Sequence, residues 1–273
     1  MHAARSPAPR DAISAAIRSA VAQGRPALVG YLTAGFPSRR EFTANLAAVA
    51  SVCDVVEIGV PFSDPMADGT TIQRASFVAL GNGVTLPWIF EQLNSLPRRH
   101  AAPILLMSYL NPLLSVGLEA LPRTAAAAGV AGFIVPDLPF EESGDLKQAL
   151  EGEGLALIQM VTPVTPAERL AMLCRDAQGF VYAVTMTGTT GKGNSDSNEV
   201  PSEVLQYMDR VKSCSRVPVC AGFGIRSADQ VARFAGHVDG VVVGSALVEV
   251  LERGEDARTF LTSLRQAPRH AGP

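Results

Sequence analysis

One glutamate in the sequence stands where acid–base chemistry is plausible. Glu57 lies inside Val55–Val60, an otherwise aliphatic run, and a carboxylate among aliphatic side chains costs free energy unless it is paired or protonated. A structural interpretation is that Glu57 hydrogen-bonds to neighbouring groups. We favour a general acid–base whose pKa is raised by burial, because glutamate is rarely buried without a reason.

The segment after this run, residues 61–73, holds two further carboxylates. Asp64 stands between a serine and a proline, a combination typical of turns, so we interpret it as a turn residue. Asp68 precedes Gly69 and suits a helix cap as well as it suits catalysis. Its position in the sequence leaves both interpretations open.

Glycines at the ends of two predicted strands indicate a phosphate site. One strand ends at Gly222-Phe-Gly224, and the last ends at Gly244-Ser245 before a helix. In eight-stranded α/β barrels, backbone amides after strands seven and eight and a helix N-terminus bind phosphate. Such glycines can also serve only close packing or tight turns. Because both strands carry the feature, we favour phosphate binding.

A polar, glycine-rich stretch follows the sixth predicted strand and is long for such a connection. It covers residues 187–198 and includes Lys192. It fits a lid that closes over a substrate and equally an ordinary surface loop. Composition does not separate these two.

Other catalytic chemistries find little support in the sequence. The three lysines, Lys147, Lys192 and Lys212, lie off the predicted strands, which argues against a Schiff-base mechanism without formally excluding Lys192. Four cysteines form no CxxC pair and four histidines are scattered. We therefore expect no metal site, no redox dithiol and no Ser-His-Asp triad. The chemistry that the sequence still supports is acid–base catalysis by carboxylates on a phosphorylated small molecule.

The charge balance points to a small-molecule function. There are 23 Lys and Arg residues against 26 Asp and Glu, a net charge of −3. This balance argues against a nucleic-acid or anionic membrane surface. No apolar stretch approaches the roughly 18 residues of a membrane span, and the charged start is unlike a secretory signal. We expect a cytoplasmic protein with reduced thiols.

The elements that must position these residues repeat along the chain. Eight apolar runs without polar alternation, each followed by a helical pattern, predict parallel strands buried on both faces. The predicted strands are Ala27–Ala34, Val55–Val60, Pro103–Tyr109, Gly132–Asp137, Leu155–Thr162, Phe180–Thr185, Pro218–Gly224 and Gly240–Ala246. Eight such units predict a (β/α)8 TIM barrel with an extra N-terminal helix. A doubly wound open sheet is the alternative, but the glycine motif expected after its first strand is missing.

We expect one domain over residues 1–273, because no linker divides the chain, with frayed tails at 1–8 and 267–273. Helix starts are marked by capping-box spacing at Ser38–Glu41, Thr165–Glu168 and Ser227–Gln230. Thr85 precedes a further helix with proline in its first turn, and another begins at Glu141.

Several motifs together resemble one known family. The longest is Glu57–Gln73, EIGVPFSDPMADGTTIQ. Shorter ones are YLTAGFP at 31–37, MSYLNP at 107–112, PDLP at 136–139, FVY at 180–182, GFGI at 222–225 and GSA at 244–246. Over nearly the whole chain the sequence resembles the tryptophan synthase alpha subunit. Thr70 stands where many members have proline, and the residues around the Thr-Gly-x-Thr-Gly core of Met186–Asn198 also differ.

The resemblance implies a lyase of L-tryptophan biosynthesis. This family cleaves indole-3-glycerol phosphate to indole and glyceraldehyde 3-phosphate in a retro-aldol reaction. By position, Glu57 would protonate C3 of the indole, and Asp68 would stabilise and then remove the charge at the indole NH. The indole ring is the electron sink, so this chain would need no cofactor or metal.

The resemblance also assigns binding residues. Tyr31 and Tyr109 would line the indole pocket with the end of strand four, Tyr182 would contact the substrate near Glu57, and Thr190 would meet Asp68 on closure. The phosphate would be held by Gly191, Gly224, Gly244 and Ser245.

A partner is implied as well. Members pair with a beta subunit in an α₂β₂ assembly, and indole passes between the two sites through a tunnel. The loops around Asp64-Pro65 and Asn111-Pro112 would face beta, which would carry the pyridoxal phosphate. The alternatives are a stand-alone lyase that releases free indole, a non-catalytic partner that regulates beta, and another phosphate-binding barrel such as an isomerase or a phosphoribosyl enzyme.

Overall fold

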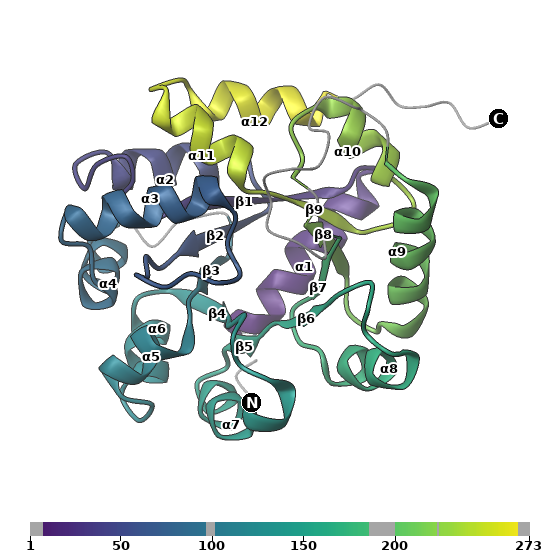
Figure 1. The fold of residues 1–273 in the computed structure, drawn as a ribbon, viewed down its shortest axis with the longest axis horizontal. Coiled ribbons are helices and arrows are strands. Elements are labelled where there is room, and N and C mark those ends of the chain that lie inside the picture. Colours follow the sequence, from purple (N-terminus) through teal and green to yellow (C-terminus); the bar gives the residue numbers. More distant parts are fainter. Residues whose placement is uncertain (1–7, 97–101, 186–199, 223, 267–273) are drawn as a thin grey trace, which may run out of the picture.

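A computed structural model describes residues 8–96, 102–185, 200–222 and 224–266. Within these ranges a single parallel sheet has the strand order β5-β4-β3-β2-β1-β9-β8-β7-β6. Its strands are β1 (Ala27–Thr33), β2 (Val55–Gly59), β3 (Ile104–Met107), β4 (Val130–Ile134), β5 (Ala156–Leu157), β6 (Gln159–Val161), β7 (Val181–Val184), β8 (Val219–Gly222) and β9 (Gly240–Val243). Figure 1 looks along the axis of the barrel that this sheet forms.

All eight predicted strands are confirmed, and the fifth is interrupted at Ile158. The Ile158 amide still donates to the Phe133 carbonyl on β4 at 2.8 Å, whereas Gln159 already pairs with Val181 of β7. The two outer strands of the sheet are therefore consecutive pieces of one segment, and this segment brings the sheet into its barrel shape. The open doubly wound sheet is wrong.

Helices surround the barrel on its outer side (Figure 1). They are α2 (Phe42–Ala50), α3 (Thr70–Gly81), α4 (Leu86–Ser95), α5 (Leu110–Val116), α6 (Leu121–Ala127), α7 (Gly144–Gly152), α8 (Ala167–Asp176), α9 (Ser202–Cys214), α10 (Ala228–Phe234), α11 (Ser245–Glu252) and α12 (Ala257–Arg265), with a 3₁₀ turn, η1, at Phe140–Glu142. This alternation of strands and helices agrees with the predicted (β/α)8 barrel.

The predicted N-terminal helix, α1 (Pro9–Ala22), covers the amino-terminal end of the barrel. Its Ile13 and Ile17 are fully buried in one cluster with Val29 and Val55, which line the barrel interior. The helix also bonds to loops that precede strands, because Ser14 donates to the Gly179 carbonyl. This end of the barrel is therefore closed by packing.

The capping signals were half right. Thr85 accepts from the Trp88 amide, and Ser227 forms the full capping box with Gln230. The Ser38 and Thr165 boxes are wrong: the Ser38 hydroxyl donates to the Glu41 carboxylate at 2.6 Å, and α2 begins only after Glu41.

Thr165 caps a turn instead of a helix. Its hydroxyl accepts from the Thr162 amide at 3.0 Å, and α8 begins only at Ala167 without a side-chain cap. The helix predicted from Glu141 begins later, at Gly144, after the short 3₁₀ turn.

Strand register explains how the barrel presents its inner side chains. Val29 of β1 pairs with Val55 of β2, and Tyr31 pairs with Glu57. Since side chains alternate along a strand, Tyr31 and Glu57 face the interior like the two valines, one layer nearer the carboxyl ends. Within the described ranges, no helix is long and apolar enough to cross a membrane.

Candidate active site

Glu57 is buried in the centre of β2. It is 1% exposed, and neither carboxylate oxygen has a hydrogen-bond partner among the described residues. The structural interpretation, in which Glu57 bonds to its neighbours, therefore has no support. Burial first, and then the charge of Asp68, raise the pKa of Glu57 to about 8. The side chain holds a proton at neutral pH and is suited to donate it.

Asp68 lies in the loop between β2 and α3 and is 8% exposed. Its carboxylate does not cap α3, since that helix begins at Thr70 after Gly69 with no side-chain cap. Burial raises the pKa of Asp68 to about 6, and a hydrogen bond from Tyr109 opposes the rise. Asp68 is thus largely ionised at the pH where Glu57 is protonated.

Tyr109 holds the Asp68 loop. Its hydroxyl accepts from the Ala67 amide at 2.8 Å, and its ring stacks on Phe62 with centroids 5.1 Å apart. Its hydroxyl also bonds to Asp68, as noted above. Sequence reasoning missed Phe62, because nothing in the chain order shows that the two rings meet.

Two further tyrosines line the interior near Glu57. Tyr31 shares a hydrogen bond with Thr33 at 3.3 Å, and burial followed by the Asp68 charge raises its pKa. Burial followed by the Glu57 charge raises the pKa of Tyr182 on β7. Both phenols therefore stay neutral and can act as hydrogen-bond donors.

Glycines make room for these two rings. A Cβ added at Gly59 would lie 2.1 Å from the Tyr31 hydroxyl, and one at Gly222 would lie 2.7 Å from Cε1 of Tyr182. Gly222 was expected to serve phosphate binding as part of a strand end, but its contact shows a packing role. Its neighbour Gly224, in contrast, has a φ of +66° and no atom within 4 Å of an added Cβ.

Three of the predicted phosphate residues, Gly224, Gly244 and Ser245, follow β8 and β9 at the carboxyl ends of these strands. Gly244 is the N-cap residue of α11, and Ser245 is the first residue of this helix. No side chain caps the helix. The nearest atom to a Cβ at Gly244 would be 3.9 Å away, so packing does not require glycine there. The first amides of a helix lack intrahelical partners and attract anions. The arrangement therefore suits a phosphate.

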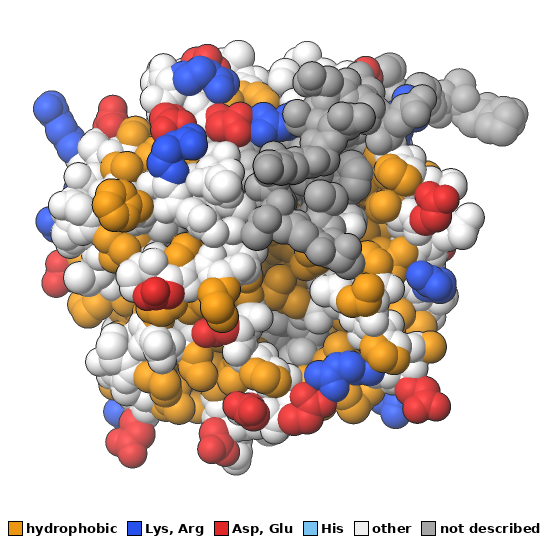
Figure 2. All heavy atoms as spheres, viewed as in Figure 1, with side chains coloured by type: hydrophobic (Ala, Val, Ile, Leu, Met, Phe, Trp, Pro, Cys, Tyr) orange, Lys and Arg blue, Asp and Glu red, His pale blue; other side chains and the backbone are white. Residues whose placement is uncertain are grey.

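Two predicted residues, Thr190 and Gly191, lie outside the described residues together with the rest of the proposed lid. Their roles stay predictions. Among the remaining predicted residues, Glu57, Asp68, Tyr31, Tyr109 and Tyr182 are close enough to interact through their charges. In Figure 2, apolar side chains gather in the centre of the face seen down the barrel, while most charged side chains lie toward its edge.

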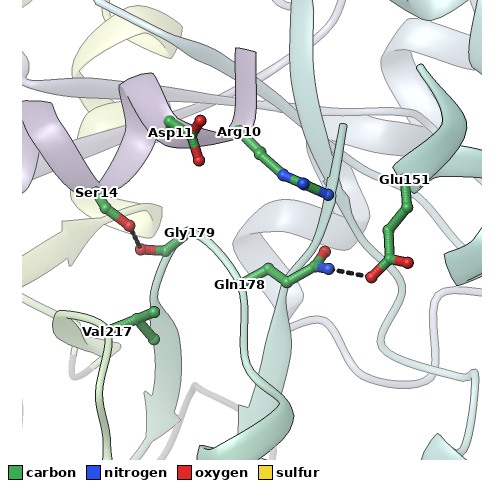
Figure 3. Close-up of a pocket in the computed structure, with 7 residues that line it drawn as sticks. All are labelled: Arg10, Asp11, Ser14, Glu151, Gln178, Gly179 and Val217. Carbon is green, nitrogen blue, oxygen red and sulfur yellow. Dashed lines mark hydrogen bonds between the residues drawn. The ribbon is translucent and has the colours of Figure 1, made fainter. Parts of the chain in front are cut away.

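A separate pocket lies at the opposite, amino-terminal end (Figure 3). It is lined by Arg10, Asp11, Ser14, Glu151, Gln178, Gly179 and Val217. Several of its polar groups are already paired, since Ser14 donates to the Gly179 carbonyl and Gln178 donates to Glu151. Because barrel enzymes carry out their chemistry at the carboxyl-terminal end, this pocket is not the active site.

A parallel α/β barrel whose interior holds two buried carboxyls with raised pKa values fits an acid–base enzyme of the barrel class. The model of the family described as "Tryptophan synthase alpha chain" matches residues 17–271. The chain belongs to the tryptophan synthase alpha chain family, the lyases of tryptophan biosynthesis. The family resemblance is confirmed, and the other phosphate-binding barrels are excluded.

Close relatives agree over most of their length. The tryptophan synthase alpha chain of Solidesulfovibrio magneticus is 46% identical over 91% of this chain and 96% of its own. A structure of Mycobacterium tuberculosis tryptophan synthase matches with a TM-score of 0.85 at 36% identity, over 94% of this chain and 98% of that chain. The alpha subunit of Legionella pneumophila matches with a TM-score of 0.83 at 31% identity, over 94% and 97%.

Proposed function

We propose that this chain cleaves indole-3-glycerol phosphate to indole and glyceraldehyde 3-phosphate, with Glu57 as the acid–base. The observation that carries the proposal is the buried Glu57 carboxyl, which has no hydrogen-bond partner among the described residues and a pKa of about 8. Such a group is a proton donor at neutral pH and is poised to act on a substrate that fills the barrel mouth.

The reaction uses both carboxylates. Glu57 gives its proton to C3 of the indole, which leaves positive charge on the ring nitrogen, and the ionised Asp68 stabilises that charge at the NH group. The bond between C3 and the glycerol carbon then breaks, and its electron pair returns to the ring. The hydroxyl proton leaves as the aldehyde forms, and Glu57, now a carboxylate, is the base available to accept it.

The surrounding residues orient the substrate. Tyr31 and Tyr109, with the end of β4, line the indole pocket, and Tyr182 contacts the substrate near Glu57. The phosphate is held by Gly191, Gly224, Gly244 and Ser245. On closure, Thr190 meets Asp68.

The partner is a tryptophan synthase beta subunit in an α₂β₂ complex. The solved relatives from Mycobacterium tuberculosis are described as tryptophan synthase, which supports this pairing. The loops around Asp64-Pro65 and Asn111-Pro112 face beta, and two apolar side chains beside them, Met66 at 82% and Leu114 at 46% exposure, favour contact there. Pyridoxal phosphate belongs to beta, and this chain's own step uses no cofactor. The cytoplasmic location stays a prediction.

The test is indole release from indole-3-glycerol phosphate by the purified chain, with and without a beta subunit. Weak release alone and strong stimulation by beta support the alpha role. Fast release without beta favours the stand-alone lyase. No release in either condition contradicts the proposed chemistry and revives the non-catalytic regulatory partner.

A further inference from the structure

Glu249 joins three segments around the proposed active site. It lies on α11, one helical turn after Ser245. Its carboxylate accepts two hydrogen bonds from Arg226, at 2.7 and 2.9 Å. The Thr71 hydroxyl donates to the same carboxylate at 3.4 Å.

Each partner of Glu249 leads to a different part of the site. Arg226 stands in the loop after β8, shortly after Gly224, on the proposed phosphate side. Thr71 is in the first turn of α3, directly after the loop that carries Asp68. One carboxylate thus connects the phosphate side, through both α11 and Arg226, with the segment that positions Asp68.

The Arg226–Glu249 part of this link has a fixed geometry, and the Thr71 bond is the longer of its contacts. A guanidinium that donates two parallel bonds to a carboxylate is fixed in plane as well as in distance. Arg226 also lowers the pKa of Glu249, so the carboxylate is ionised at neutral pH. The ion pair is partly exposed, at 41% and 24% for the two side chains, and such pairs add little to stability.

A second pair ties the same two helices without reaching the phosphate side. Arg74 of α3 donates to Glu252 of α11 at 2.9 and 2.6 Å. Arg74 and Glu252 lie one turn further along their helices than Thr71 and Glu249. Glu252 is therefore a matched control for Glu249, with the same residue type, helix and partner helix.

We propose that Glu249 is a positioning residue that couples occupancy of the phosphate side to the order of the Asp68 loop, through Arg226 and Thr71. This inference rests on the proposed function, because it takes the phosphate site and the role of Asp68 from there. It predicts that a phosphate monoester without any indole ring already stabilises the loop.

The direct test is amide hydrogen exchange of residues 61–70, with and without sn-glycerol 3-phosphate. In the wild type and in Glu252→Ala, the ligand slows exchange in this loop. In Glu249→Ala, we expect the ligand to bind within about twofold of the wild-type affinity. The factor by which it slows amide exchange in the loop should be about fivefold or more smaller than in the wild type. Equal protection in Glu249→Ala, or equal loss in Glu252→Ala, overturns the proposal.

Kinetics give a second readout. Glu249→Ala and Thr71→Val lower kcat by about fivefold or more with a smaller change in KM, because Asp68 is misplaced after binding. Thr71→Ser keeps the hydroxyl and retains most of kcat, and Glu252→Ala stays within about twofold of the wild type. A kcat for Glu249→Ala that matches Glu252→Ala contradicts the coupling.

The two failures are distinguishable. An active wild-type enzyme in which Glu249→Ala behaves like Glu252→Ala overturns this inference alone. A wild-type chain that neither cleaves indole-3-glycerol phosphate nor binds glycerol 3-phosphate overturns the proposed function, and the inference with it.

Discussion

At the amino-terminal end of the barrel, Asp54 accepts four hydrogen bonds, two from Arg25 and one each from Arg265 and the Leu28 amide. In the barrel interior, both carboxylate oxygens of Glu57 lack a partner among the described residues. Asp54 directly precedes β2 and Glu57 lies at the centre of that strand, yet the first carboxylate has four hydrogen-bond donors and the second has none among the described residues.

A similar contrast exists between Asp239, just before β9, and Tyr182 of β7. Asp239, which precedes β9, accepts from the Val219 amide at 2.9 Å and pairs with Lys212 at 3.1 Å. Tyr182 of β7, in contrast, lies buried near Glu57, and burial keeps its hydroxyl neutral. The Asp54 and Asp239 carboxylates at the amino-terminal end join elements of the fold, whereas the Glu57 carboxyl remains available to a substrate.

The largest expected effect comes from Glu57→Gln, which removes the bare carboxyl and keeps its shape. Because a positioned general acid contributes about 10²–10⁴-fold, we expect indole release to fall by that range. Release by Glu57→Gln at the wild-type rate would falsify the assignment of the acid.

Stability provides the control for this variant. The folded state raises the pKa of Glu57 from its ordinary 4.5 to about 8, so the native protein binds more protons than the unfolded chain between these values. The free energy of unfolding of the wild type should therefore fall as pH rises through this window. Urea denaturation across pH should show a smaller fall for Glu57→Gln; an equal fall would mean that Glu57 does not titrate as inferred.

The dependence of the rate on pH separates the two carboxylates. The reaction needs Asp68 ionised and Glu57 protonated, and their pKa values are about 6 and about 8. We expect kcat/KM to peak between these values and to fall about tenfold per pH unit beyond each. Asp68→Asn should be slow and should lose the acidic limb. If kcat/KM of the wild type stays constant from about pH 5 to about pH 9, the reaction does not need an ionised Asp68 and a protonated Glu57.

Asp54→Ala should lower the stability of the fold and leave the activity unchanged, whereas Glu57→Gln should lower the activity. It leaves the Leu28 amide and parts of two guanidinium groups without their partner, at a site where Asp54 is only 12% exposed. We expect a loss of about 2 kcal/mol in the free energy of unfolding, because the arginines keep partial access to water. Activity per folded molecule should not change. If activity falls with stability intact, the division between the two ends of the barrel is wrong.

The sequence was informative where a residue contradicts its surroundings. Glu57 was predicted as a catalytic residue because a carboxylate interrupts an aliphatic run, and the strands were found because such runs recur. Gly244 was predicted as a phosphate residue because a glycine precedes a helix at a strand end. In each case the signal lies within a few neighbouring residues.

Features that depend on distant residues were not predictable. Arg265 reaches Asp54 across 211 positions, and the stack of Phe62 on Tyr109 depends on how the loop after β2 meets the end of β3. The capping box predicted at Ser38 is wrong for a related reason. The Ser38 hydroxyl donates to the Glu41 carboxylate, and α2 begins at Phe42, directly after Glu41. Local patterns predict elements, and tertiary packing decides their boundaries and partners.

Among the substitutions of Glu57, Asp68 and Tyr109, Tyr109→Phe should lower kcat least, and it tests whether the Tyr109 hydroxyl holds the Asp68 loop in place. The change removes the hydroxyl that accepts from Ala67 and bonds to Asp68, while the ring keeps its stack on Phe62. We expect kcat to fall about tenfold, because the Ala67 amide loses its acceptor and Asp68 loses its hydrogen bond from Tyr109. Because that bond lowers the pKa of Asp68, the acidic limb of the rate profile should also move to higher pH.

Tyr207→Phe is the matched control for this substitution. Tyr207 is a buried tyrosine of α9, and its hydroxyl has no hydrogen-bond partner within the described ranges. Its removal should leave both kcat and the acidic limb unchanged, with no loss of stability, because no bond is broken. If Tyr109→Phe lowers kcat but leaves the limb in place, Tyr109 supports only the backbone of the loop. If neither kcat nor the acidic limb changes, other contacts hold Asp68. The Tyr109 hydroxyl then does not position this carboxylate for the reaction.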